Sequence, residues 1–356
     1  MKIIHCGDIH LDSKIESNLP PAKSRERKKE IIMAFCKMVD YAAENGVTAV
    51  IIAGDLFDSD RMLQSTRDIV LGKISNCAET DFLYLCGNHD AGKALAEGEL
   101  PDNLKLFSDR WTSYTYENVT ITGAELTADN CRHIYDSLVL PKGCFNIVTM
   151  HGQLSSSVGE DMVNRTSLAE KGIDYLALGH YHCFDKGNLG KNGMWCYSGC
   201  LEGRGFDECN DKGFAVLDIA ADGTYTHKFV KNSLRDITEV ECDITGLCDT
   251  AEILQSIDSK CAAISENAMV KVVLTGNVPA GARKDTDYLL KHLNERFWFA
   301  KVKDKTRIQL RAEDYENDIS LKGEFIRQVK SAGLDEVMCD RVIECGLAAL
   351  SGQEVQ

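Results

Sequence analysis

Histidine, aspartate and asparagine gather in five short stretches of the chain, each of which directly follows an apolar run. The stretches are Asp8-Ile9-His10, Gly54-Asp55-Leu56-Phe57-Asp58, Gly87-Asn88-His89-Asp90, His151-Gly152 and Gly179-His180-Tyr181-His182. Imidazole nitrogens with carboxylate and amide oxygens are ligands for divalent metals, and paired metal ions hydrolyse phosphate esters. One such stretch alone is better explained by a satisfied loop or core histidine. Five in succession favour a two-metal hydrolytic site.

The elements that must position these residues are predicted to be buried strands. The five apolar runs are 2–6, 49–53, 82–86, 145–150 and 175–178. Helical periodicity separates the first three, at 25–45 and 62–77. Because ligands bind at the carboxyl ends of strands in an α/β sheet, the five stretches are expected to meet at one edge. Further strands are predicted at 111–116, 119–123, 194–197, 213–219 and 225–230, and short helices at 130–138 and 166–171.

The order of the five stretches resembles that of the calcineurin-like metallophosphoesterases. Three patterns narrow the resemblance to the SbcD-type DNA repair exonucleases, and among them to the YhaO-like branch. They are Ile4-His5-Cys6-Gly7-Asp8-Ile9-His10-Leu11-Asp12, then Gly54-Asp55-Leu56-Phe57-Asp58, and then Tyr197-Ser198-Gly199 followed by Glu202-Gly203-Arg204-Gly205-Phe206. The resemblance covers the first two thirds of the chain best. It implies an α/β fold, a four-layer αββα sandwich with a C-terminal α+β capping domain.

The chain is accordingly expected to have three parts. Residues 1–235 would form the phosphoesterase (nuclease) domain and 236–312 the α+β capping domain, with strands at 237–244, 269–274 and 301–310 and helices at 249–265 and 285–297. Residues 313–356 would carry two helices, at 321–331 and 334–350. Their apolar stripe is explained equally well by core packing and by docking on a partner. The partner that the resemblance implies is an SMC-like coiled-coil ATPase.

The resemblance also implies a set of metal ligands. Asp55 matches the residue that bridges both ions. One site would be completed by Asp8, His10 and His182, and the other by Asn88, His151 and His180. Mixed nitrogen and oxygen ligands favour Mn²⁺, with Fe or Zn as alternatives.

Three further side chains are candidates for roles at the phosphate. By the resemblance, His89 would contact the phosphate and donate a proton to the leaving oxygen. Asp90 would orient His89 through a hydrogen bond. Arg204 is a candidate phosphate contact; the alternative is an arginine in a turn that is simply solvated. For Asp58, a catalytic role and a structural role as a carboxylate at a turn both stay open.

Charge bears on the choice of substrate. The net charge of -15 argues against strong autonomous binding to nucleic acid, although metals, a local basic track and a partner could hold DNA. Candidates for the track are Lys14, residues 23–29, Lys186, Lys191 and Arg204, while a solvated helix start explains 23–29 slightly better.

The function that the resemblance implies is a 3′-to-5′ DNA exonuclease and single-strand endonuclease in repair and recombination. Alternatives are a small-substrate phosphoesterase, acting on nucleotides or phosphoproteins, and a non-enzymatic ATPase scaffold, which the complete ligand set disfavours.

Composition predicts a cytoplasmic protein. No apolar run reaches membrane-spanning length, and the first residues lack a signal-peptide pattern. The 15 cysteines are scattered, many of them in apolar runs, which is typical of reduced thiols in a reducing compartment. The sequence leaves a homodimer open.

Overall fold

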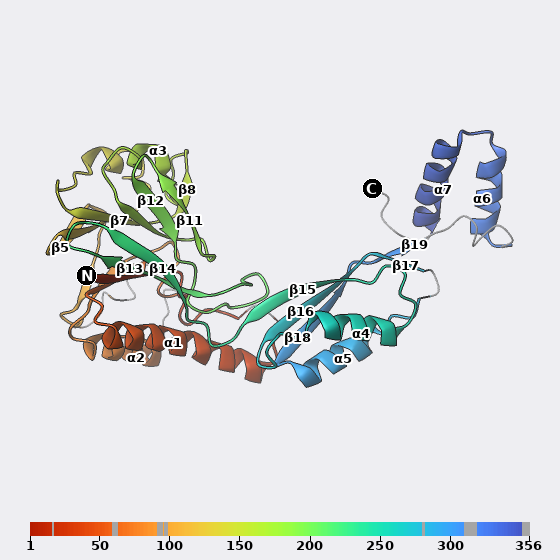
Figure 1. The fold of residues 1–356 in the computed structure, drawn as a ribbon, viewed down its shortest axis with the longest axis horizontal. Coiled ribbons are helices and arrows are strands. Elements are labelled where there is room, and N and C mark those ends of the chain that lie inside the picture. The colour runs from red at the N-terminus through yellow and green to blue at the C-terminus, as the bar shows by residue number, and fades with distance from the viewer. Residues whose placement is uncertain are drawn as a thin grey trace. The chain divides into compact units, whose positions relative to one another are not determined.

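The computed structural model describes residues 1–15, 18–58, 63–90, 95, 99–279, 282–309 and 319–350. Residues 311–318, which lie between the last predicted strand and the first predicted C-terminal helix, are outside these ranges, as is the predicted start of the second helix at 62. The chain divides into two compact units, Met1–Ile237 and Thr238–Gln356, whose elements are labelled in Figure 1.

The first unit contains two mixed six-stranded sheets. The first sheet has the order β14-β13-β1-β2-β3-β4, with β1 to β4 parallel and the other two strands antiparallel. Its strands are β1 (Lys2–Cys6), β2 (Ala49–Ala53), β3 (Asp81–Leu85), β4 (Leu104–Leu106), β13 (Gly213–Ile219) and β14 (Tyr225–Lys231).

The second sheet has the order β11-β12-β10-β7-β6-β5, in which β6, β7, β10 and β12 run parallel. Its strands are β5 (Thr112–Tyr116), β6 (Val119–Gly123), β7 (Phe145–His151), β10 (Tyr175–Gly179), β11 (Asp185–Leu189) and β12 (Gly193–Tyr197). A small parallel pair, β8 (Gln153–Ser155) and β9 (Met162–Asn164), follows β7.

Alternating side chains on these strands define four layers. Ile3 packs with Ile147 in the core between the two sheets, whereas the next residue, Ile4, packs with Phe35 of a helix on the opposite face. On the outer face of the second sheet, Leu176 packs with Leu168. The covering helices are α1 (Pro21–Glu44) and α2 (Gln64–Ser75) on the first sheet, and α3 (Arg165–Leu168) and the 3₁₀-helix η1 (Ile134–Ser137) on the second. The predicted four-layer sandwich is therefore confirmed (Figure 1).

The second unit is α+β, followed by a helical hairpin. One sheet has the order β15-β16-β18, and β17 pairs with β19. These elements are β15 (Ile237–Asp243), α4 (Thr250–Lys260), β16 (Met269–Thr275), β17 (Asn277–Pro279), α5 (Thr286–Arg296), β18 (Phe299–Asp304), β19 (Arg307–Gln309), α6 (Leu321–Ser331) and α7 (Glu336–Leu350). Both α4 and α5 begin at an aspartate, Asp249 and Asp285, whose side chain accepts hydrogen bonds from N–H groups of the first turn.

The structure differs from the predicted elements in three ways. The first helix begins at Pro21, four residues early, because proline fits the first turn, where its missing N–H costs nothing. The predicted strand 301–310 is two strands, separated by a turn in which Asp304 accepts a hydrogen bond from the N–H of Thr306. Strands β4, β8, β9, β11 and β17 were not predicted, because they are short or polar. No helix in the described ranges is long and apolar enough to cross a membrane.

A buried cluster of ion pairs joins α1 to the loop after β12. The guanidinium of Arg27 is fully buried and contacts Glu30, the carbonyl oxygen of Gly203 and, at 2.7 Å, Glu202. Arg235 contacts Glu30 from the other side. Arg27 is therefore not available to a phosphate, and the run 23–29 is not a continuous basic track.

Replacing Arg27 with methionine is expected to lower the free energy of unfolding by about 3–5 kcal/mol, because buried carboxylates lose their counter-charge. Urea denaturation measures the change. The matched control is Arg25→Met, at an exposed position of the same helix, where a change within about 0.5 kcal/mol is expected. Equal destabilisation by the two variants would show that the cluster contributes nothing.

Candidate metal centre

The predicted ligands lie at the carboxyl ends of five parallel strands. Asp8, Asp55 and Asn88 follow β1, β2 and β3, which are neighbours in the first sheet, while His151 and His180 end or follow β7 and β10, which are neighbours in the second. Among the described residues, ligand atoms within 4.8 Å of one another form three overlapping groups: Asp8, His10 and His182; Asp8, Asp55 and His151; and His10, Asp58 and His89. The structure thus brings the two sheet edges together around these side chains.

Four of the predicted ligands have left-handed backbone, which non-glycine residues seldom adopt. Their φ values are 51° at Asp8, 51° at His10, 52° at Asp55 and 101° at His180. Hydrogen bonds hold this conformation, since the N–H groups of Ile9 and His10 both donate to the carbonyl oxygen of Asp55. Each such residue costs on the order of 1–3 kcal/mol, and strain of this kind clusters at functional sites.

The first ligand cluster is built around two imidazoles. The Nε2 atoms of His10 and His182 lie 3.1 Å apart. Their Nδ1 atoms contact carboxylates, at 2.8 Å from Asp58 and 2.6 Å from Glu208. A carboxylate on Nδ1 leaves the Nε2 lone pair to face a metal. In addition, Oδ2 of buried Asp8 has no hydrogen-bond partner, so the cluster fits a cation.

The second cluster gathers around His151. Its Nδ1 donates to the carbonyl oxygen of Ala53 at 2.9 Å, and its Nε2 lies 2.9 Å from Oδ1 of Asn88 and 3.4 Å from Oδ2 of Asp55. Nδ1 of His180 lies 3.4 Å from the same Asn88 oxygen. The Asp55 oxygen is also 3.7 Å from Nε2 of His10. Asp55 therefore lies within reach of a histidine from each cluster, the position that a ligand shared by two ions would occupy.

Negative charge is concentrated at this position. Burial opposes ionisation of Asp55, but its hydrogen bond to His151 and the charge on that ring prevail and lower its pKa to about 2. Burial likewise disfavours the charged form of His151, yet Asp55 and Asp8 raise the pKa of His151 to about 9. The same carboxylates would attract a divalent cation.

This raised pKa predicts that metal binding depends on pH. Below about pH 9 His151 carries a proton that a metal must displace, so affinity for Mn²⁺ should fall as the pH falls. Between about pH 6 and about pH 8 we expect close to a tenfold change in affinity for each pH unit. Calorimetry in two buffers of different ionisation enthalpy would count the released protons. An affinity that does not change with pH would contradict the assignment of His151.

His89 lies at the open side of the centre. Its backbone N–H donates to Oδ1 of Asp55 at 2.9 Å, while its side chain is 50% exposed. Its ring Nδ1 lies 3.6 Å from Oδ1 of Asp58. The ring is thus held beside the ligand clusters while its other edge is free to meet a substrate.

The placement of Asp90 differs from the predicted hydrogen bond to His89. The buried Asp90 carboxylate accepts hydrogen bonds from the N–H groups of Leu56, Phe57 and Gly87, and within the described part of the chain no hydrogen bond joins it to His89. Asp90 therefore braces the loops that carry Asp55 and Asn88. We propose Asp58, not Asp90, as the carboxylate that orients His89.

The contacts that Glu208 makes with His182 and with Arg204 were not predicted from the sequence. Glu208, buried behind His182, accepts hydrogen bonds from Nε of Arg204 at 3.0 Å and from its Nη2 at 2.7 Å. Burial raises the pKa of Glu208, but His182 and Arg204 outweigh it and hold the pKa far below its usual range. Arg204 also lies 3.4 Å from Asp58. It thus links the two carboxylates that contact His10 and His182, and its contact with a phosphate stays a prediction.

Gly54 allows the two sheet edges to approach each other. Its φ is +92°, and a Cβ atom there would overlap Nδ1 of His151. Gly54→Ala is therefore expected to displace His151 and to weaken metal binding by at least about tenfold.

Isothermal titration with Mn²⁺ measures this loss. The matched control is Gly72→Ala in α2, where a Cβ meets no atom within 4 Å, so affinity should be unchanged and the helix stabilised by about 0.5–1 kcal/mol. Normal metal affinity in Gly54→Ala would contradict the described packing.

Comparison with known proteins agrees with this geometry. The calcineurin-like phosphoesterase family model matches residues 1–184. The uncharacterized metallophosphoesterase YhaO of Bacillus subtilis is 25% identical over 299 residues, covering 78% of this chain and 72% of YhaO. The DNA double-strand break repair protein Mre11 of Halobacterium salinarum is 24% identical over 350 residues, covering 94% and 86%. Mre11 of Haloferax volcanii is 25% identical over 363 residues, covering 98% and 75%.

The family match spans more than half of the chain and includes all seven predicted metal ligands. The chain therefore belongs to the calcineurin-like phosphoesterases, a family of hydrolases that use divalent metal ions.

Proposed function

We propose that this protein is a two-metal phosphodiesterase that cleaves DNA. The observation that carries the proposal is the position of Asp55, whose Oδ2 lies 3.4 Å from one ligand histidine and 3.7 Å from another. The similarity to two proteins named for DNA double-strand break repair, over 94% and 98% of this chain, supports DNA as the substrate.

Each ligand cluster would hold one divalent ion. Asp8, His10 and His182 would hold the first, Asn88, His151 and His180 the second, and Asp55 would touch both. The mixed nitrogen and oxygen ligands favour Mn²⁺, with Fe or Zn as alternatives. When bound, the two ions supply Lewis acidity and neutralise charge on the phosphate.

The remaining side chains would act on the substrate directly or through a neighbour. His89, exposed beside the clusters, would donate a proton to the leaving oxygen. Asp58, 3.6 Å from its ring, would favour the protonated form and fix the ring orientation. Arg204 would balance the charges of Asp58 and Glu208 and contact the phosphate if it moves away from Asp58.

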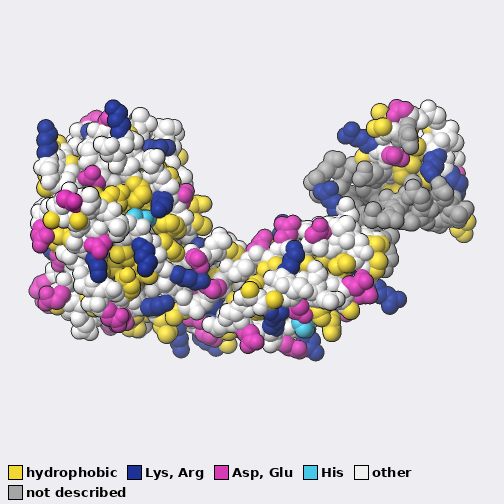
Figure 2. All heavy atoms as spheres, in the orientation of Figure 1, with side chains coloured by type: hydrophobic (Ala, Val, Ile, Leu, Met, Phe, Trp, Pro, Cys, Tyr) yellow, Lys and Arg dark blue, Asp and Glu magenta, His cyan; other side chains and the backbone are white. Residues whose placement is uncertain are grey.

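A small-substrate phosphoesterase is the second candidate, and the net charge of -15 favours it. On the face drawn in Figure 2, Lys and Arg side chains are interspersed with Asp and Glu side chains. Assays with Mn²⁺ on linear duplex, single-stranded DNA and p-nitrophenyl esters decide between the two. Cleavage of DNA from 3′ ends would support the proposal, and turnover of the esters alone would reject it.

Because the net charge of -15 weakens binding to DNA, a partner protein would supply the missing affinity. We propose the α6–α7 hairpin as the surface on which this partner docks. Ile326, Val329, Ile343 and Leu347 pack against one another inside the hairpin. Val337 and Leu321 remain 80% and 71% exposed. These exposed apolar side chains suit a coiled-coil ATPase of the SMC-like type.

Co-purification with such an ATPase tests the docking surface. Val337→Glu together with Leu321→Glu should abolish it, while Arg341→Glu, an exposed change on α7, should not. Binding to a short duplex at physiological salt should be weak without the partner. Tight binding by the protein alone would refute the need for a partner.

A further inference from the structure

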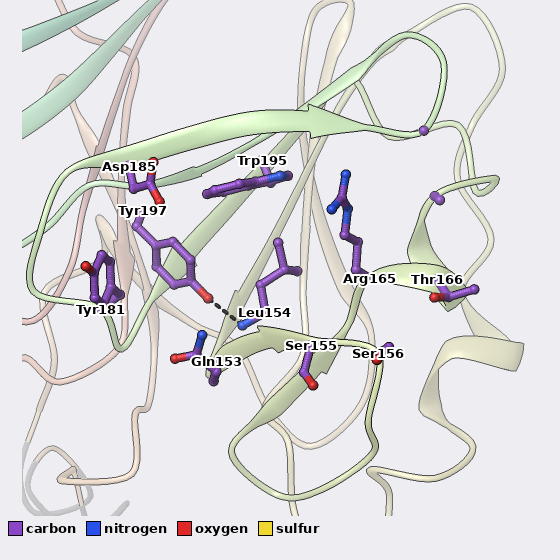
Figure 3. Close-up of a pocket in the computed structure, with 12 residues that line it drawn as sticks. Gln153, Leu154, Ser155, Ser156, Arg165, Thr166, Tyr181, Asp185, Trp195 and Tyr197 are labelled. Atoms are coloured by element: carbon purple, nitrogen blue, oxygen red, sulfur yellow. Dashed lines mark hydrogen bonds between the residues drawn. The ribbon is translucent and has the colours of Figure 1, made fainter.

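A cleft of about 920 Å³ is lined by residues that neighbour three predicted ligands along the chain, with Gln153 two residues after His151 and Tyr181 between His180 and His182. Tyr181, which lines it, stands between the predicted ligands His180 and His182 and is 45% exposed. The other walls come from β12, which contributes Trp195 and Tyr197, and from β8 and α3 (Figure 3). One wall of the cleft is therefore formed by a residue that is bonded on both sides to predicted metal ligands.

Three aromatic rings follow one another along the cleft. The ring centroids of Tyr181 and Tyr197 are 5.6 Å apart at 71°, and those of Trp195 and Tyr197 are 5.9 Å apart at 70°. Tyr197 is fixed in place, because its hydroxyl donates to the carbonyl oxygen of Gly152 at 2.9 Å and accepts from the N–H of Leu154 at 2.6 Å. Figure 3 shows the second of these bonds. Because Gly152 follows His151, the rigid ring is tied to the ligand loop.

The cleft is close to electrically neutral. Its charged lining residues are Arg165 and Asp185, which have opposite sign, and both are exposed to solvent. Nη2 of Arg165 donates to the carbonyl oxygen of Asn188 at 2.8 Å. Gln153 and Ser155 add neutral donors and acceptors. Such a lining suits a flat, neutral group with polar edges, whereas a phosphate would be drawn to the ligand clusters.

We propose that this cleft binds the nucleobase of the nucleotide next to the scissile phosphate, by stacking on Tyr181. The inference rests on the proposed nuclease function and adds the substrate contact. A base inside the cleft cannot remain stacked and paired in a duplex, so cleavage requires an unpaired end. Stacking of this kind tolerates every base, because each has a π-face, and selects nucleic acid over other phosphate esters.

The test compares two single-stranded oligonucleotides with the Mn²⁺-loaded full chain. One ends in a normal nucleotide and the other in an abasic residue at the scissile end. Tyr181→Ala should lower the ratio of the cleavage rate of the normal substrate to that of the abasic one by about 5-fold to 150-fold, the range that loss of one stacked base produces. Tyr181→Phe, which keeps the ring, should retain the wild-type ratio. Tyr288→Ala, an exposed tyrosine on α5, is the matched control.

Two outcomes would overturn the base site. One is an unchanged ratio in Tyr181→Ala. The other is an equal fall on both substrates with loss of bound metal, which would mean that Tyr181 only supports the ligand loop. If the wild-type protein cleaves no DNA, the proposed function fails by itself. Equilibrium dialysis with deoxyadenosine then decides the site: binding that Tyr181→Ala abolishes supports it, and no binding to the wild-type protein rejects it.

Discussion

Asp55→Asn is expected to remove both bound metal and hydrolytic activity. The Asp55 side chain is 2% exposed, and its Oδ2 lies within 3.7 Å of ligand nitrogens from both clusters. An amide of the same shape keeps the packing but removes the negative charge that both ions would share. We expect metal content to fall from two ions per chain toward none, and turnover to fall by several orders of magnitude, measured by elemental analysis and phosphodiester hydrolysis.

Asp218→Asn is the matched control for this variant. Asp218 lies on β13 of the same sheet, and its side chain is 55% exposed, so metal content and turnover should remain at wild-type values. Full metal occupancy in Asp55→Asn would show that Asp55 does not bridge the two clusters.

His89→Ala should separate catalysis from metal binding. His89 belongs to neither predicted ligand set, and its ring is half exposed beside the clusters. Loss of a general acid lowers turnover by about two to four orders of magnitude. Both metals should remain bound, because all seven predicted ligands are intact. The comparison of kcat with metal content therefore distinguishes this variant from Asp55→Asn.

A second histidine variant controls for the loss of an imidazole. His133 is exposed and belongs to none of the three ligand groups, so His133→Ala should leave kcat unchanged. The proton-donor role of His89 is rejected if His89→Ala loses metal or turns over at the wild-type rate. A leaving group of low basicity, such as p-nitrophenolate, should reduce the effect of the variant, because that group departs without a proton.

The ligand positions were predictable because a buried parallel strand has a plain signature. Apolar runs such as 49–53 end abruptly at Gly, Asp, Asn or His. Burying a polar side chain at that point costs free energy unless it has a partner, so a ligand role is favoured. The αββα layering followed from the resemblance, and the packing of Ile3 and Ile4 into different cores confirms it.

What the sequence could not provide is the support around those ligands. Glu208 is 26 residues from His182 along the chain, and their contact depends on how the loop after β12 folds back. A charged run such as 23–29 appears solvated until Glu202, 175 residues from Arg27, is placed beside it. Asp90 was predicted to form a hydrogen bond with its sequence neighbour His89, but its carboxylate accepts hydrogen bonds from the loop that follows β2. Long-range polar contacts leave no periodicity in the sequence.

The strand order of the first sheet also determines when, during synthesis, the protein can become active. β1 lies between β2 and β13, with Ile3 opposite Leu217. Until residue 219 has left the ribosome, β1 is an unpaired sheet edge, and the loop that carries Asp8 and His10 lacks a fixed base. Three of the predicted ligands, His151, His180 and His182, emerge late as well. A nascent or truncated chain that ends before β13 is therefore expected to be inactive, so hydrolysis can begin only once the first sheet is complete.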